Sequence, residues 1–152
     1  KNCEEERLLG VSLTGIFDNE WLRNASASQL QTLRDVAICQ NKEWSKKLGI
    51  NQAAAVTCVK PSGTVSQLTN TSSGIHPRYA KTYWRRVRQD KKDPISDALI
   101  EAGVPHVTDP YNADAWSFKF AMEAPKGAVC NDDITAIEHL EIWKNFALKF
   151  IN

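Results

Sequence analysis

The chain has 152 residues, enough for one domain with a hydrophobic core, and 42% of them are hydrophobic and 24% charged, as is usual for a soluble globular protein. Its formal net charge of +1 gives no overall preference for nucleic acid or a membrane surface, and its apolar runs are too short to span a bilayer. The first residues do not read as a signal peptide and include no initiator Met, so we expect a cytoplasmic protein whose N-terminus is cut from a longer chain.

The cysteines are widely spaced, which excludes paired metal ligands and argues against a secreted disulfide framework. We interpret all of them as reduced thiols. Two lie in apolar stretches and are expected to be small core residues, namely Cys39 and Cys58. The other two are Cys3 and Cys130.

The first part of the chain predicts a strand, a helix and a second strand. Residues 8–16 are short, branched and flanked by polar groups, as in a buried strand, and residues 54–59 repeat that pattern. A long helix is expected between them. This order favours an α/β fold in which the two strands pair in parallel, and we expect residues 1–152 to form a single domain.

The predicted helix has clear start and stop signals. Ser26 or Ser28 can cap its N-terminus, the helix runs to about Leu48, and Gly49 ends it. Apolar residues at helical spacing predict one buried face: Leu30, Leu33, Ala37, Trp44 and Leu48.

Three further elements are expected before the last helix. Residues 82–89 alternate as in a strand, and residues 116–122 alternate apolar with small or polar residues in the same way. Between them, residues 94–102 predict a short helix that Asp93 caps and Gly103 ends.

The last predicted helix begins after Asp132 or Asp133, with Thr135 and Glu138 at the spacing of a capping box. It runs almost to Asn152, so we expect the C-terminus also to be cut from a longer chain. Its predicted buried stripe consists of Ile137, Leu140, Trp143 and Ala147.

The most informative stretch follows the second predicted strand, where a loop leads into a helix expected over residues 64–69. Pro61 suits a first helical turn, and Gly63 would let the backbone come close to a ligand. Free amides at a helix start, together with hydroxyls and the helix dipole, form a good anion site. The residues expected to bind phosphate are Pro61, Ser62, Gly63, Thr64, Val65 and Ser66.

The residues alone leave another interpretation open for this loop. Helix starts commonly carry hydroxyl side chains, so the loop could merely cap its own helix. It is not a Walker loop, because it lacks Gly-x-x-x-x-Gly-Lys.

Two other features also leave alternatives open. His76 could contact a substrate or cofactor, or could be a hydrogen-bonded structural residue of its loop. The other histidines show no metal-ligand spacing, so no metal site is expected. Residues 78–88 interleave basic residues with Tyr83 and Trp84, which suits single-stranded nucleic acid or simply the solvated face of a strand.

Several motifs in the same order resemble the class II, adenosylcobalamin-dependent ribonucleotide reductases. The loop segment Lys-Pro-Ser-Gly-Thr-Val-Ser-Gln-Leu is the most specific of them. Residues 5–16 resemble an earlier barrel strand, particularly that of the monomeric ribonucleoside-triphosphate reductases. The matching segments are residues 5–16, 60–68, 73–79 and 83–88, with weaker matches at 124–128 and 136–141.

This resemblance implies part of a ten-stranded α/β barrel, taken from the C-terminal half of a catalytic domain. In the family, adenosylcobalamin supplies a radical that passes to a cysteine on a finger loop with an Asn-Pro-Cys-Gly-Glu-like motif. This chain has no such motif, and Cys3 does not match it in position, so no catalytic residue is expected here. The implied partners are a nucleotide substrate and the rest of the reductase, with nucleic acid and membrane not expected.

The rival hypothesis is a non-catalytic module that binds a nucleotide or single-stranded nucleic acid through residues 78–88. The two hypotheses differ in the expected ligand. The reductase segment should bind a nucleoside triphosphate at the 61–66 loop, whereas the rival module should bind an oligonucleotide.

Overall fold

The computed structural model describes residues 2–63 and 65–152, which form two compact units. The parallel unit comprises the chain up to Tyr79 together with Pro125–Asn152, and the hairpin unit comprises Ala80–Ala124. The placement of one unit against the other is not determined, so the single domain expected over residues 1–152 stays a prediction.

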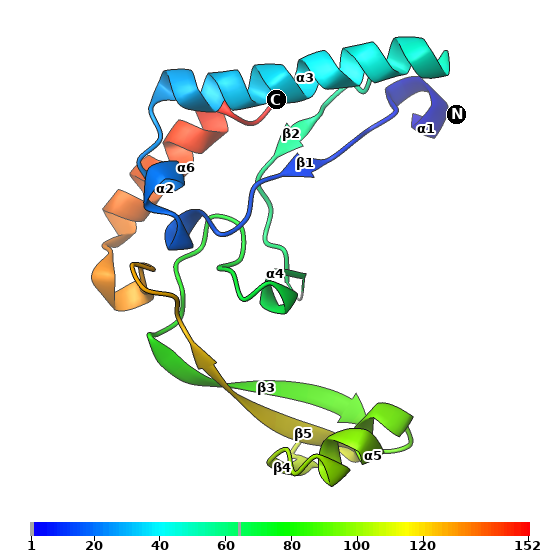
Figure 1. Cartoon of the computed structure of the whole chain (residues 1–152), viewed down its shortest axis with the longest axis vertical. Helices are drawn as coiled ribbons and strands as arrows, with labels where there is room; N and C mark the ends of the chain where they lie inside the picture. The colour runs from blue at the N-terminus through cyan, green and yellow to red at the C-terminus, as the bar shows by residue number, and fades with distance from the viewer. Residues whose placement is uncertain (1, 64) are drawn as a thin grey trace. The chain divides into compact units, whose positions relative to one another are not determined.

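The parallel unit is built around a strand–helix–strand arrangement (Figure 1). Strand β1 pairs in parallel with β2, with Val11 opposite Thr57, and the long helix α3 connects them. The predicted parallel pairing is therefore confirmed. The elements of this unit are α1 (Asn2–Glu6), β1 (Val11–Ser12), η1 (Ile16–Asp18), α2 (Glu20–Arg23), α3 (Ala27–Leu48), β2 (Thr57–Cys58), α4 (Val65–Leu68), η2 (Asn131–Asp133) and α6 (Ala136–Lys149).

Both predicted strands of this unit are longer than the strands observed. Only two residues of 8–16 and two of 54–59 form a ladder. Gly15 adopts a left-handed φ of 71°, which breaks the extended backbone and turns Ile16 and Phe17 into the core as a 3-10 helix. Leu8 and Leu9 are exposed, so the prediction that this strand is buried is wrong over its first residues.

Helix α3 begins and ends where its caps predict. Ser26 and Gln29 form a capping box, and Gly49 closes the helix with a left-handed backbone. The predicted buried face is only half correct. Leu30 is fully buried in the core, whereas Trp44 and Leu48 are exposed, because α6 packs under the first part of α3 and not under its end (Figure 1).

Helix α6 (Ala136–Lys149) is capped by Thr135, which forms a capping box with Glu138. The predicted cap at Asp132 or Asp133 is wrong, because both lie in the short helix η2 before it. The predicted buried stripe is wrong at three positions, which are largely exposed: Ile137, Leu140 and Trp143. The face that packs into the core instead follows the spacing of Ile142, Phe146 and Phe150.

The hairpin unit is a three-stranded antiparallel sheet in the order β3-β5-β4, with one helix packed beside β3 (Figure 1). Asp93 caps that helix. In the sheet, Phe118 of β5 is fully buried and lies opposite Val87 of β3. The two strands and the helix predicted here are confirmed. The elements are β3 (Thr82–Asp90), α5 (Pro94–Glu101), β4 (His106–Asp109) and β5 (Asn112–Glu123).

Membrane spans, metal clusters and the burial of the cysteines can be examined in the described residues. Across residues 2–63 and 65–152, no helix has the length and apolarity needed to cross a bilayer, and no cluster of three or more His, Cys, Asp or Glu could hold a metal ion. Cys3, Cys39 and Cys58 are free thiols. Cys39 is exposed and Cys58 only half-buried, so the expectation that both are core residues is wrong.

Candidate phosphate-binding site

The 61–66 loop leaves the sheet at an edge that both parallel strands share. Because β1 and β2 run in the same direction, the residues that follow each strand meet there. Thr14, just after β1, places its Oγ1 3.2 Å from the Oγ of Ser62. The Thr14 hydroxyl also donates to the Ser72 carbonyl (3.0 Å) and accepts from the Gly74 amide (2.9 Å).

The loop satisfies part of its own hydrogen-bonding capacity. The Ser62 amide donates to the Oγ of Ser73 (2.9 Å), and the Val65 amide donates to the Ser62 carbonyl (3.1 Å). The buried Ser66 hydroxyl donates to the Gly63 carbonyl at 3.4 Å. Two of the amides expected to face an anion are thus engaged within the protein. Thr14, Ser62 and Ser73 together form what we term the hydroxyl cluster.

The helix after the loop is shorter than predicted. Helix α4 covers only Val65–Leu68, and Thr64, a predicted phosphate ligand, lies outside the described residues. A single turn of helix carries only a small macrodipole. Attraction for an anion here must therefore come from hydroxyls, from loop amides and from the exposed Lys60 at the start of the loop.

Two glycines shape this region in different ways. Gly63 has a φ of +56°, and a Cβ added there would meet nothing within 4 Å. Gly74 has the same φ, but a Cβ added there would lie 2.5 Å from the carbonyl oxygen of Lys60. The close backbone approach within the protein therefore occurs at Gly74, whereas Gly63 presents a bare backbone to open space, as a ligand-facing position requires.

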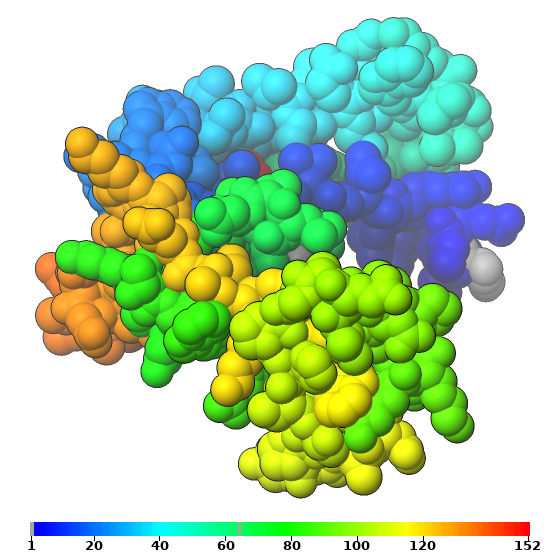
Figure 2. All heavy atoms as spheres, turned by 60° about the horizontal axis from the view of Figure 1, so that its bottom comes forward, coloured from blue at the N-terminus to red at the C-terminus, as the bar shows by residue number. Residues whose placement is uncertain are grey.

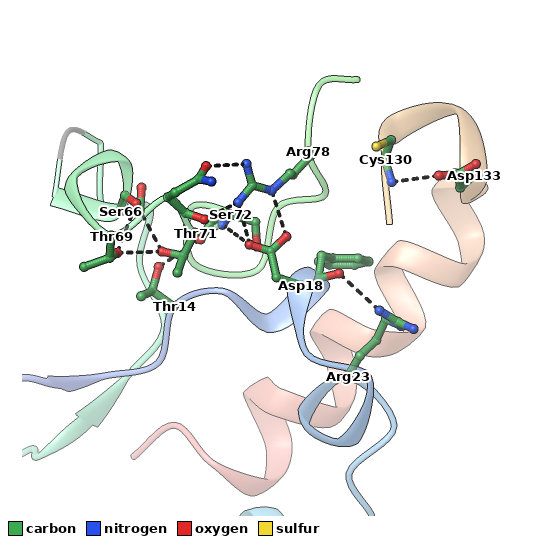
Figure 3. Close-up of polar contacts among 12 residues, drawn as sticks. Thr14, Asp18, Arg23, Ser66, Thr69, Thr71, Ser72, Arg78, Cys130 and Asp133 are labelled. Atoms are coloured by element: carbon green, nitrogen blue, oxygen red, sulfur yellow. Dashed lines mark hydrogen bonds and ion pairs between the residues drawn. The ribbon is translucent and has the colours of Figure 1, made fainter. Parts of the chain in front are cut away.

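A buried ion pair contacts the segment that follows the loop (Figure 3). The Arg78 guanidinium donates from Nε and Nη2 to the two carboxylate oxygens of Asp18, each at 2.9 Å. Asp18 also accepts the Ser72 amide at 2.6 Å. Arg78 reaches Asn70 as well, through the side-chain oxygen (3.1 Å) and the main-chain carbonyl.

Sequence reasoning missed several of these residues. Thr14, Ser73 and the Asp18–Arg78 pair were not predicted to belong to the site. Thr14 has only a partial signal: its strand, predicted over residues 8–16, is expected to be parallel to the one that precedes the loop, but the sequence does not show that the strand ends before Thr14. The ion pair has none, because its partners lie 60 residues apart.

His76 lies on the turn that follows Ser73. Its Nδ1 lies 3.2 Å from the Ser73 carbonyl oxygen, and its ring centroid lies 6.1 Å from that of His139. The Nε2 of His139 in turn lies 2.7 Å from the carbonyl oxygen of Ile75. These contacts fit the structural interpretation of His76, and its contact with a substrate or cofactor stays a prediction.

The basic segment 78–88 does not act as one surface. Arg78 is buried in the parallel unit, whereas Arg86, Arg88 and Trp84 are exposed on β3 of the hairpin unit. Arg88 is also engaged, since its Nε donates to Asp109 at 2.8 Å. Arg78 is therefore closed off from a nucleic acid, which weakens the rival hypothesis.

Several known proteins are similar to this chain in sequence. No protein-family model matches the chain. It is, however, 29% identical over 82% of its length to the adenosylcobalamin-dependent ribonucleoside-triphosphate reductase of Lactobacillus acidophilus, and 34% identical over 80% to that of Lactobacillus delbrueckii subsp. bulgaricus. The chain is homologous to one segment of these reductases. It spans 20% of the length of each.

Two further comparisons agree with this homology. The reductase of the same name from Euglena gracilis is 33% identical over 64% of the chain, which spans 14% of that relative. A crystal structure of a B12-dependent, class II ribonucleotide reductase superposes with a TM-score of 0.79 over 98% of this chain and 25% of the reductase, at 21% identity. The predicted α/β fold class and the predicted resemblance are both confirmed.

Proposed function

We propose that this chain forms part of an adenosylcobalamin-dependent ribonucleotide reductase, which converts ribonucleoside triphosphates or diphosphates to deoxyribonucleotides. Homology to one segment of reductases of that name, in several organisms, carries the proposal. Within that enzyme, the chain contributes strands to a ten-stranded α/β barrel and joins the remainder of the reductase.

In the proposed enzyme, the 61–66 loop binds the phosphates of the substrate. Three observations support this role: the loop lies at the carboxyl edge of two parallel strands, Gly63 faces open space, and Lys60 is exposed beside it. The hydroxyl of Ser62 can donate to a phosphate oxygen by rotating away from its 3.4 Å contact with Ser73. Among the residues that the structure describes, the Gly63 amide donates no hydrogen bond, so it is a second donor for the same anion.

The radical step is not assigned to any residue of this chain, because the sequence has no match to the finger-loop cysteine motif of the family it resembles. In the proposed enzyme the cofactor supplies the radical that starts the reaction. We therefore derive no step of the radical chemistry from this chain.

The test uses the full-length reductase that contains this segment. Gly63→Val adds a branched side chain to the open face of the loop, so nucleotide affinity should fall more than in Ser62→Ala, which removes one hydroxyl worth about 1 kcal/mol. Gly49→Val is the matched control, because Gly49 also has a left-handed φ (65°) and open surroundings but ends α3. Affinity would be measured by calorimetry with a nucleoside triphosphate.

Two outcomes decide the matter. A loss of affinity in Gly63→Val with no loss in Gly49→Val supports phosphate binding at the loop. Unchanged affinity in Gly63→Val contradicts phosphate binding, and the loop would then only cap the helix that follows it. Tight binding of a single-stranded oligonucleotide that Arg86→Glu abolishes would instead favour the rival module, since Arg86 and Trp84 are exposed on the same strand.

A further inference from the structure

The Asp18–Arg78 pair is a buried, fully engaged junction between distant parts of the parallel unit. The side chain of Arg78 is 3% exposed and that of Asp18 is 10% exposed. Their contact is bidentate, which fixes the orientation of the guanidinium as well as its charge. The main chain of Arg78 is also held, since its amide donates to Val129 and its carbonyl accepts from Asn131.

The pair connects to the phosphate loop through the segment Asn70–Ser72. Asn70 has a left-handed φ of +47°, and Arg78 holds it through two oxygens. Next along the chain, Thr71 donates to the Ser66 carbonyl from its amide (2.9 Å) and from its hydroxyl (3.2 Å). Ser66 is the last residue of the 61–66 loop, so the ion pair reaches the loop through two successive contacts (Figure 3).

A second connection runs to the other side of the loop. Asp18 accepts the Ser72 amide, and the Ser72 carbonyl accepts both the Gly15 amide (2.9 Å) and the Thr14 hydroxyl (3.0 Å). Thr14 is the member of the hydroxyl cluster that contacts Ser62. Asp18 and Arg78 therefore constrain the loop from its helix end and from its strand end.

The charges of the pair exclude a direct role for Arg78 in binding phosphate. Asp18 neutralises the guanidinium at 2.9 Å, and both side chains are buried. A buried arginine that already makes two bonds to a carboxylate and two to Asn70 would have to break them to reach an anion. The pair can instead fix the position of the segment Asn70–Ser72, which it contacts through hydrogen bonds.

We infer that Asp18 and Arg78 are positioning residues for substrate phosphate binding: they hold Asn70–Ser72, and through it the 61–66 loop, in the shape that receives the phosphates. The inference rests on the proposed function of that loop. It assigns a role in substrate affinity to two residues that do not touch the substrate.

The experiment compares Arg78→Lys, Asp18→Asn and Thr71→Val in the full-length reductase. Lysine keeps the positive charge but loses the bidentate fork, and asparagine keeps the shape of Asp18 but loses its charge. Thr71→Val leaves the ion pair intact and removes the hydroxyl that donates to the Ser66 carbonyl and contacts the Thr69 hydroxyl. Lys47→Met is the control, because it breaks an exposed ion pair with Glu43 on α3.

The readouts are kcat, KM for a ribonucleoside triphosphate, the Ki of inorganic tripolyphosphate as a competitive probe, and Tm. We expect Arg78→Lys to raise KM and Ki together by about tenfold, the loss that one charge-assisted hydrogen bond can produce, with kcat nearly unchanged. Asp18→Asn and Thr71→Val should show smaller increases of the same kind, and Lys47→Met none. A purely structural role would lower Tm and the active fraction, so kcat would fall while KM and Ki stayed constant.

Three outcomes are distinguishable. Parallel increases in KM and Ki support the inference. If Gly63→Val weakens nucleotide binding but Arg78→Lys and Thr71→Val leave KM and Ki unchanged, the loop binds phosphate and the positioning role is overturned. If Gly63→Val also has no effect, the proposed function of the loop fails and this inference fails with it. Should Arg78→Lys not fold, Thr71→Val carries the same decision with the ion pair intact.

Discussion

Gly74 and Gly49 have similar left-handed backbones and opposite surroundings. A methyl group on Gly74 would lie 2.5 Å from the Lys60 carbonyl oxygen, whereas one on Gly49 would meet nothing within 4 Å. Gly49→Ala should therefore cost about 1 kcal/mol of unfolding free energy, from backbone strain alone. Gly74→Ala should cost about 3 kcal/mol, because the turn at Gly74 must also move away from Lys60.

Urea unfolding of the two variants and the parent chain would measure this difference. Equal costs for both substitutions would show that the turn at Gly74 yields without loss, and that it does not brace the loop.

Single residues of the site could be predicted only where their signal is local. Ser62 and Gly63 stand in a recognisable loop, and the Gly63 backbone has the positive φ that its glycine suggests. Thr14, Ser73 and the Asp18–Arg78 pair depend on contacts between distant segments. Whether a serine faces a ligand or another serine is decided by the tertiary fold, which a single sequence does not display.

Strands β3 and β4 lie on opposite sides of β5, and a polar contact connects them. Arg88 on β3 donates to Asp109 at the end of β4, and Asp109 is largely buried there. The hydrogen bond from Arg88 lowers the pKa of the Asp109 carboxyl, and the hydrogen bond from the Tyr111 amide lowers it further. Burial raises this pKa, but by less than the Arg88 hydrogen bond lowers it. The ionised carboxylate therefore favours the folded hairpin unit.

The sign of the pH dependence follows from this lowered pKa. The contribution of Asp109 to stability should be complete above its unfolded pKa of about 3.9 and should be lost as the pH falls through its folded value. Arg88→Met should raise the folded pKa, so its stability deficit relative to the parent should be present at neutral pH and shrink at about pH 2. NMR titration of the Asp109 side-chain carbon and urea unfolding at both pH values would measure this. A deficit that persists unchanged in acid would mean that Arg88 acts through packing.

Whole elements were predictable to the extent that their signals lie within them. Helix α3 and helix α5 have caps that are read directly from Ser26, Gly49 and Asp93, and β3 and β5 have strict alternation. The strands β1 and β2 were predicted too long because an apolar run does not reveal how many partners it has. The stripe of α6 was misplaced for the same reason: Leu140 and Trp143 have helical spacing, but both are exposed.

At the scale of the molecule, the chain should bind the phosphates of a ribonucleotide without reducing its ribose. The radical chemistry requires cysteines in a motif that this sequence lacks. We therefore expect the 152-residue chain, with adenosylcobalamin, a dithiol and each of the ribonucleotides, to form no deoxyribonucleotide. Turnover that disappears in Cys3→Ser would show that Cys3 carries the radical after all.

The apolar surface of the parallel unit leads to the last prediction. Between the N-terminal segment and α3 lies a hollow of about 500 Å³, and the blue and cyan atoms of these two segments are neighbours in Figure 2. Large exposed apolar residues border it, which is unusual for a surface that stays in water. They are Leu8, Leu9, Trp44, Leu48 and Ile50.

Strand β1 also has a free edge beyond its pairing with β2 in the described sheet, and free edges recruit further strands. In the proposed enzyme, the rest of the barrel covers this surface. The isolated chain should therefore bind a hydrophobic dye and self-associate, and a separately produced remainder of the reductase should suppress both effects.

Trp44→Glu should weaken the assembly of this chain with the remainder, because it places a charge in the contact. Lys42→Glu should not, since Lys42 is exposed two positions earlier and so points to the other side of α3. Sedimentation velocity would measure self-association and assembly, and fluorescence would measure dye binding. A monodisperse chain that binds neither the dye nor the remainder of the reductase would argue against a barrel segment.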